Sequence, residues 1–178
     1  MHKALFIRII SLTSALLITL IVVAYLYGLR LNFSKSYPIG IYQKIQKQTI
    51  QKGDMVMLCP KNSPTMQMAL LRGYLLKGFC EGGYYPLLKK VVATSGDEIT
   101  FKKYLYVNGI KIPNSQRYQY DAKMQLLPQP TYEAKRLKQS ELFVMSDHFA
   151  KSFDSRYFGV VSQEDVISHM KALYTIDH

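Results

Sequence analysis

The sequence predicts a mostly β domain with one short helix, preceded by a single N-terminal transmembrane helix. Three observations lead to this prediction: an uncharged run near the N-terminus, a series of short apolar segments separated by Gly, Pro, Asn and Asp, and a helix start signal in only one later segment. The chain has 178 residues. About 145 residues remain after the apolar end, which is the size of one domain. We therefore expect a membrane segment at residues 1–30 and one domain at residues 31–178.

The uncharged run extends from Ile9 to Tyr27. Its roughly 19 residues would form a helix about 28 Å long, close to the thickness of a bilayer's hydrocarbon core. His2, Lys3 and Arg8 precede it, which places the N-terminus in the cytoplasm and the following domain on the outer, periplasmic face of the cytoplasmic membrane. The alternative is a cleaved signal peptide, because residues 22–24 (VVA) resemble a cleavage site.

The chain is basic, with 23 Lys and Arg against 12 Asp and Glu and a net charge of +11. Such a charge suits an anionic membrane surface, nucleic acid or acidic substrates. The basic residues are scattered, and no aromatic spacing repeats with them as a base-stacking surface would require. We therefore expect no nucleic-acid partner.

A turn at residues 52–54 introduces a short strand at residues 55–58. Ser63 and Pro64 then form an N-cap and a first helical position. Gly73 or Gly78 is expected to end this helix. Its apolar stripe is predicted to consist of Met66, Leu70 and Leu71.

Cys59 and Cys80 bracket the predicted helix. In a domain outside the cytoplasm, two cysteines at this separation predict a disulfide, worth about 3 kcal/mol on the loop-entropy model. Their spacing matches no zinc pattern, and the alternative is a pair of free buried thiols.

Residues 86–93 (PLLKKVVA) predict an apolar strand that contains two lysines. Because side chains alternate across a strand, Lys89 and Lys90 must point to opposite faces. We expect one lysine to point inward and the other to be solvated.

The remaining segments are also predicted to be mainly strands. Residues 104–112 read as a hairpin with Asn108 and Gly109 at its tip. Residues 113–140 are polar and contain three prolines, which indicates a long surface excursion. Further strands are predicted at residues 141–145, 160–161 and 166–176.

Ser34 and Ser36 lie in a Ser-, Pro- and Gly-containing stretch at residues 32–42. In an extended segment their side chains share one face, an arrangement that suits a serine nucleophile with a neighbouring hydroxyl donor. An ordinary loop has the same composition. Ser36 follows Tyr27 closely enough that it must lie within about 30 Å of the predicted membrane helix.

Four segments match, in order, the motifs of a known family. The segments are residues 34–42 (SKSYPIGIY), 53–56 (GDMV), 89–97 (KKVVATSGD) and 152–159 (SFDSRYFG). On these motifs the chain resembles the serine-lysine signal peptidases and, among them, the TraF-type peptidases of conjugative transfer. The resemblance covers most of the predicted domain and implies a signal-peptidase-like β-barrel or coiled β-sheet.

The resemblance implies that Ser36 is the nucleophile and Lys89 the general base. A serine hydroxyl needs a base to become a good nucleophile. A lysine can serve only when neutral, so burial must lower its pKa by roughly two units or more. His148 offers a Ser-His alternative.

The resemblance also implies roles for four further residues. Ser34 would join the backbone N–H of the nucleophile in the oxyanion hole, and Ser152 would orient the lysine amine. Asp154 and Arg156 would support the site, with Asp154 essential for catalysis. A structural salt bridge is the alternative for this pair.

The sequence departs from the usual family pattern beside these motifs. The proline lies one residue closer to the nucleophile than in most signal peptidases, and Ser146-Asp147 replaces the usual Gly-Asp. These departures affect the surroundings of the site more than the reaction.

The implied activity is cleavage of a membrane-inserted pre-protein, such as a conjugative pilin, with or without cyclisation of the product. We expect no metal and no organic cofactor. The alternatives are a general signal peptidase and a non-catalytic, membrane-tethered factor of a conjugation or secretion apparatus.

Overall fold

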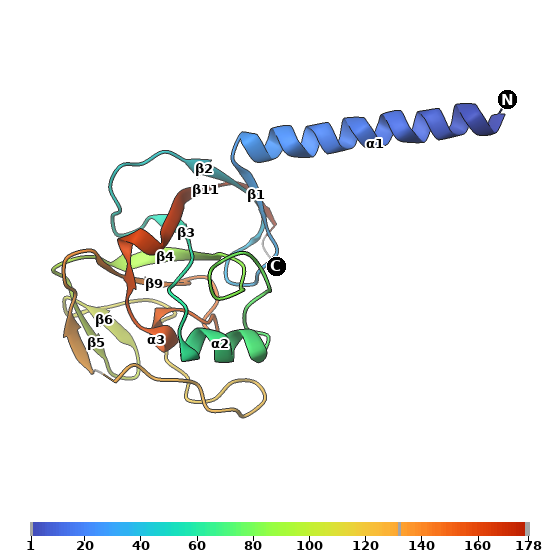
Figure 1. Cartoon of the computed structure of the whole chain (residues 1–178). Helices are drawn as coiled ribbons and strands as arrows, with labels where there is room; N and C mark the ends of the chain where they lie inside the picture. The colour runs from blue at the N-terminus through green and yellow to red at the C-terminus, as the bar shows by residue number, and fades with distance from the viewer. Residues whose placement is uncertain (1, 132, 177–178) are drawn as a thin grey trace.

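The computed structural model of the chain describes residues 2–131 and 133–176. It shows a long N-terminal helix joined to two antiparallel β-sheets (Figure 1). This arrangement confirms the predicted mostly β fold with an N-terminal apolar helix.

Helix α1 spans His2–Leu26 and extends away from the sheets (Figure 1). Its segment Leu5–Leu26 is long and apolar enough to cross a membrane, as a signal sequence also can be. Its apolar side chains are exposed along most of this length, so the domain leaves them largely uncovered. The helix therefore has the length and apolar composition expected of a membrane span at residues 9–27.

The larger sheet has seven strands in the order β1-β2-β11-β3-β4-β9-β10. Strand β1 was not predicted, and it extends across the boundary expected at residue 30. The division of the chain into a membrane segment and one domain stays a prediction. The strands are β1 Leu29–Asn32, β2 Ile39–Ile45, β3 Met55–Leu58, β4 Leu87–Ala93, β9 Glu141–Met145, β10 Val161–Ser162 and β11 Val166–Ile176.

The smaller sheet has four strands in the order β7-β6-β5-β8. Asn108 and Gly109 both have positive φ at the tip of the β6–β7 hairpin, which confirms the predicted turn. The strands are β5 Glu98–Phe101, β6 Leu105–Val107, β7 Ile110–Lys111 and β8 Ala134–Arg136. Strand β8 gives the predicted polar excursion one element of regular structure.

Helix α2 spans Pro64–Leu71, and its N-cap Ser63 accepts a hydrogen bond from the Met66 amide at 3.2 Å, as predicted. The predicted apolar stripe was partly wrong. Leu71 is 87% exposed, whereas Ala69 is fully buried beside Met66. Leu71 lies at the last turn, just before the chain leaves the helix.

The domain has a second short α-helix, so the expectation of a single one was wrong. Helix α3 spans Ser155–Phe158 and begins because the Asp154 side chain accepts a hydrogen bond from the Arg156 amide. A 3-10 turn, η1, follows at Gln163–Asp165. Four residues are too few to show helical periodicity in a sequence.

The centre of the larger sheet is a packed core that supports the candidate site. Strands β3, β4 and β9 lie side by side and contribute fully buried Val56, Val91 and Val144. The register pairs Lys89 of β4 with Val56 of β3, so this lysine extends from the centre of the larger sheet.

Candidate active site

The loop that carries Ser36 connects β1 to β2 and is held by Asn32. The Asn32 side-chain amide donates to the carbonyls of Ser34, Tyr37 and Pro38 at 3.0–3.1 Å. Its oxygen accepts from the Ser34 amide at 3.1 Å and from the Ser34 hydroxyl at 2.9 Å. One side chain therefore connects both ends of the loop around Ser36.

The structure brings Ser36, Lys89 and Ser152 together. Lys89 Nζ lies 2.7 Å from Ser36 Oγ and 2.7 Å from Ser152 Oγ, and the two hydroxyl oxygens are 3.1 Å apart. These three residues come from distant parts of the chain: the β1–β2 loop, strand β4 and the loop before α3.

Lys89 is only 2% exposed, and this burial is the main cause of its altered basicity. Burial lowers the pKa of Lys89 to about 8. The nearby Asp154 carboxylate opposes this effect, and the Arg156 guanidinium adds to it. A useful fraction of this amine is therefore neutral at mildly alkaline pH.

Lys90 points to the opposite face, as the alternation predicted, but it is not simply solvated. Its Nζ lies 2.6 Å from Asp147 Oδ2, and the Tyr37 hydroxyl donates to Asp147 Oδ1 at 3.0 Å. Asp147 thus connects the strand that carries Lys89 to the residue after Ser36.

Asp154 and Arg156 form a bidentate ion pair, and both are fully buried. Arg156 Nε and Nη2 each lie 2.8 Å from a different Asp154 oxygen. Arg156 Nη2 also donates to the Ser152 carbonyl at 3.2 Å, and Asp154 Oδ2 accepts from the Ser146 amide at 3.1 Å. The ion pair thus hydrogen-bonds to the backbone of Ser152, in the cluster, and to the backbone of Ser146, which lies beside it.

Two other predicted residues lie at the margin of the cluster. The Ser34 hydroxyl donates to Asn32, as described above. The exposed His148 ring stacks on Tyr37 with a centroid distance of 6.4 Å. Within the described residues, the side-chain partners of the Ser36 hydroxyl are Lys89 and Ser152.

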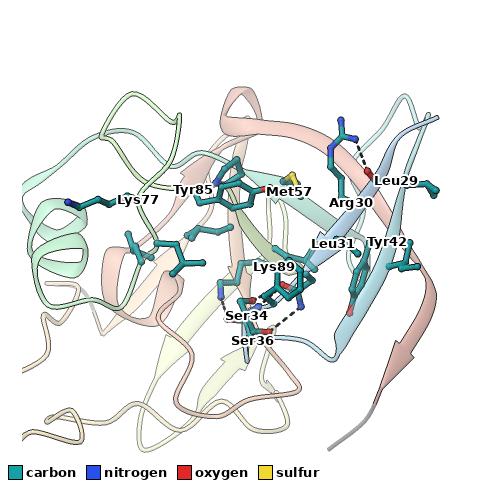
Figure 2. A pocket seen from close by; sticks show the side chains of 18 of the residues that line it. Leu29, Arg30, Leu31, Ser34, Ser36, Tyr42, Met57, Lys77, Tyr85 and Lys89 are labelled. Atoms are coloured by element: carbon teal, nitrogen blue, oxygen red, sulfur yellow. Dashed lines mark hydrogen bonds between the residues drawn. The ribbon is translucent and has the colours of Figure 1, made fainter. Parts of the chain in front are cut away.

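A cavity of about 610 Å³ opens beside Ser36. Ser34, Ser36 and Lys89 lie together in it, while Arg30 and Lys77 lie toward its margins (Figure 2). Its apolar lining comes from the end of α1, the start of β4 and the chain between α2 and β4. Examples are Ile21, Ala24, Leu87, Leu88, Leu76 and Tyr85.

Cys59 and Cys80 form a disulfide, with their Cα atoms 5.6 Å apart. It joins the chain just after β3 to the loop between α2 and β4. Leu76 and Tyr85, on either side of Cys80 in the chain, line the cavity. The disulfide therefore tethers one wall of the cavity to the central sheet.

The described residues contain no group of three or more His, Cys, Asp or Glu side chains that could hold a metal ion. That the reaction needs no metal or cofactor stays a prediction.

Comparisons with known proteins show the family of this chain. The model of the family "signal peptidase, peptidase S26" matches residues 1–175. The chain belongs to this family. The resemblance predicted from the four segments is thereby confirmed.

Two relatives of this S26 chain show how far the similarity extends. The plasmid transfer protein TraF of Escherichia coli is 36% identical over 153 residues, which cover 85% of this chain and 86% of that protein. The conjugal transfer protein TraF of Agrobacterium tumefaciens (strain 15955) is 34% identical, covering 83% of each. A solved signal peptidase I from Enterococcus faecalis V583 is 17% identical and covers 72% of this chain and 100% of its own, with a TM-score of 0.41.

Sequence reasoning missed the contacts of three residues at this S26 site: Asn32, Asp147 and Ser146, whose hydroxyl donates to the Ser36 carbonyl. Asn32 carried a usable signal, because an asparagine side chain often holds a turn by hydrogen-bonding the backbone two residues further on. Ser146 was noticed only as a departure from the usual glycine. Asp147 carried no signal, because its partners are distant in sequence.

Proposed function

We propose that this chain is a membrane-anchored serine endopeptidase with Ser36 as nucleophile and Lys89 as general base. The observation that carries the proposal is the 2.7 Å contact between Lys89 Nζ and Ser36 Oγ, with the lysine buried and its pKa lowered to about 8. A nucleophile and a base within hydrogen-bond reach, with the base oriented by a third group, are the requirements for covalent catalysis by serine. Ser152 is the proposed third group.

In the proposed reaction, Ser36 Oγ attacks the scissile carbonyl carbon while its proton passes to neutral Lys89. The tetrahedral intermediate collapses, and the protonated amine of Lys89 gives its proton to the leaving amine. The Ser36 amide and the Ser34 hydroxyl are the proposed oxyanion donors. Ser34 must first turn away from Asn32 to serve in this role.

The proposed substrate is a membrane-inserted pilin precursor with small residues before the scissile bond. Three features support this choice: the apolar cavity, the contribution of α1 to its lining, and the names of the relatives, which refer to plasmid and conjugal transfer. We propose that α1 is retained as an anchor and that the domain faces the periplasm. Water or the N-terminal amine of the substrate can resolve the acyl-enzyme, giving a linear or a cyclic product.

The proposal is tested by mass analysis of the pilin precursor in cells that express the wild-type, Ser36→Ala or Lys89→Ala chain. Both variants should leave the precursor intact, and comparable amounts of each protein in the membrane fraction serve as the folding control. Complete maturation with either variant would refute the assignment of that residue. Cleavage of ordinary secretory precursors instead would identify a general signal peptidase, and unchanged conjugation with both variants would indicate a non-catalytic assembly factor.

A further inference from the structure

The turn at Ser146 and Asp147 contacts two residues of the β1–β2 loop, Ser36 and Tyr37. We call this loop the nucleophile loop. The Ser146 hydroxyl donates to the Ser36 carbonyl, and the Asp147 carboxylate accepts from the Tyr37 hydroxyl. Two consecutive residues after β9 thus hold two consecutive residues before β2. We call Ser146 and Asp147 together the clamp.

Ser146 is fully buried, and its hydroxyl is engaged on every side. Besides donating to the Ser36 carbonyl, it accepts from the amides of His148 at 3.2 Å and Phe149 at 2.9 Å. Its own amide donates to Asp154 Oδ2 at 3.1 Å. Removing this hydroxyl would leave the partly buried Ser36 carbonyl without its side-chain donor, which costs free energy.

Asp147 provides the second contact of the clamp. Tyr37 is only 5% exposed, so its hydroxyl needs a partner inside the protein. Lys90 stands 2.6 Å from the other Asp147 oxygen and balances the negative charge. The contact therefore joins the nucleophile loop to β4, one residue away from Lys89.

The orientation of the Ser36 backbone affects two chemical requirements at once. It directs the Oγ atom toward Lys89, and it directs the Ser36 amide, the proposed oxyanion donor. A loop held only at its ends by Asn32 would leave the central carbonyl free to rotate. Displacement of reacting groups by about 1 Å can cost a hundredfold in rate.

From these contacts we infer that the clamp positions the nucleophile, and that Ser146 and Tyr37 are positioning residues of the proposed peptidase reaction. This inference rests on the proposed function. It assigns a task to the serine that replaces the usual glycine, and it gives Asp154 an indirect role as the anchor of the clamp. Neither Ser146 nor Tyr37 exchanges a proton with the substrate.

The test compares Ser146→Ala, Tyr37→Phe and the double variant in single-turnover cleavage of the pilin precursor by the full-length chain in detergent. Each single variant should lower the maximal cleavage rate by about tenfold or more with little change in the half-saturating substrate concentration. The acidic limb of the pH profile should stay in place, because Lys89 keeps its surroundings. The double variant should lose less than the product of the two single losses, since both changes release the same loop.

Ser115→Ala is the matched control. Ser115 is also fully buried and bonds to backbone only, donating to the Ile112 carbonyl and accepting from the Leu105 amide. It should lower the unfolding midpoint without changing the cleavage rate of the folded protein. Tyr37→Phe keeps the ring in place, so it gives a readable result even if Ser146→Ala fails to fold.

Wild-type cleavage rates in folded Tyr37→Phe, or losses in the single variants that merely follow their unfolding, would overturn the inference. Either result with an inactive Ser36→Ala would leave the proposed function standing. Cleavage by Ser36→Ala would instead refute the proposed function itself.

Discussion

A lysine base predicts that the rate of acylation rises with pH on the alkaline side of neutrality. Burial lowers the pKa of Lys89 to about 8, so the fraction of neutral amine is about one tenth at pH 7 and about nine tenths at pH 9. If only the neutral form accepts the proton of Ser36, the acylation rate should increase by roughly tenfold between these two pH values.

The measurement is the pH profile of single-turnover cleavage between pH 6 and pH 10, with the full-length chain in detergent. Lys89→Arg should be inactive over the whole range, because a guanidinium keeps its proton. His148→Ala should keep most of the activity and leave the limb in place, because the imidazole stacks on Tyr37 and Lys89 contacts the Ser36 hydroxyl.

A different result would refute this reasoning. If the limb centred near pH 6.5, the ordinary range of a histidine, and disappeared with His148→Ala, the base would be His148. Activity in Lys89→Arg equal to that of the wild type would also exclude the lysine as base.

Three further predictions concern stability. The free energy of unfolding of the wild type should rise relative to that of Lys89→Met by roughly 2 to 3 kcal/mol between pH 7 and pH 10, because the unfolded chain keeps a proton that the folded protein has already lost; a constant difference in urea unfolding would contradict the lowered pKa. Thiol alkylation of unreduced, denatured protein should modify neither Cys59 nor Cys80, and replacing both with serine should cost about 3 kcal/mol in the same unfolding assay; quantitative labelling would exclude the bridge. Asp154→Ala should destabilise the protein by about 3 to 5 kcal/mol by leaving Arg156 buried and unpaired, and Arg156→Met should recover part of this loss in the double variant; no recovery would show that the ion pair is not the cause.

The local features of the chain were readable from the sequence because they depend on neighbouring residues. The length of the apolar run determined α1, and the Asn108-Gly109 pair determined the β6–β7 turn. Ser63 and Pro64 determined the start of α2. The alternation of side chains along β4 required Lys89 and Lys90 to separate.

Only the tertiary structure decided which residues meet. Strand β1 forms because β2 is available to pair with it, and helix α3 forms where a buried ion pair organises a four-residue turn. Sequence alternation could not say which of the two lysines is buried. That follows from what covers each face of β4: the loops that carry Ser36 and Ser152 meet Lys89 on one face.

In the candidate site, too, the sequence predicted the residues and the tertiary structure decided their contacts. The resemblance to the signal peptidases predicted Ser36, Lys89 and Ser152 as site residues, but their approach to 2.7–3.1 Å is a property of the folded sheet. The clamp had no sequence signal, because Ser146 and Ser36 are separated by 110 residues and meet through a backbone carbonyl. Every residue has a carbonyl group, so only the fold determines which one a buried hydroxyl binds.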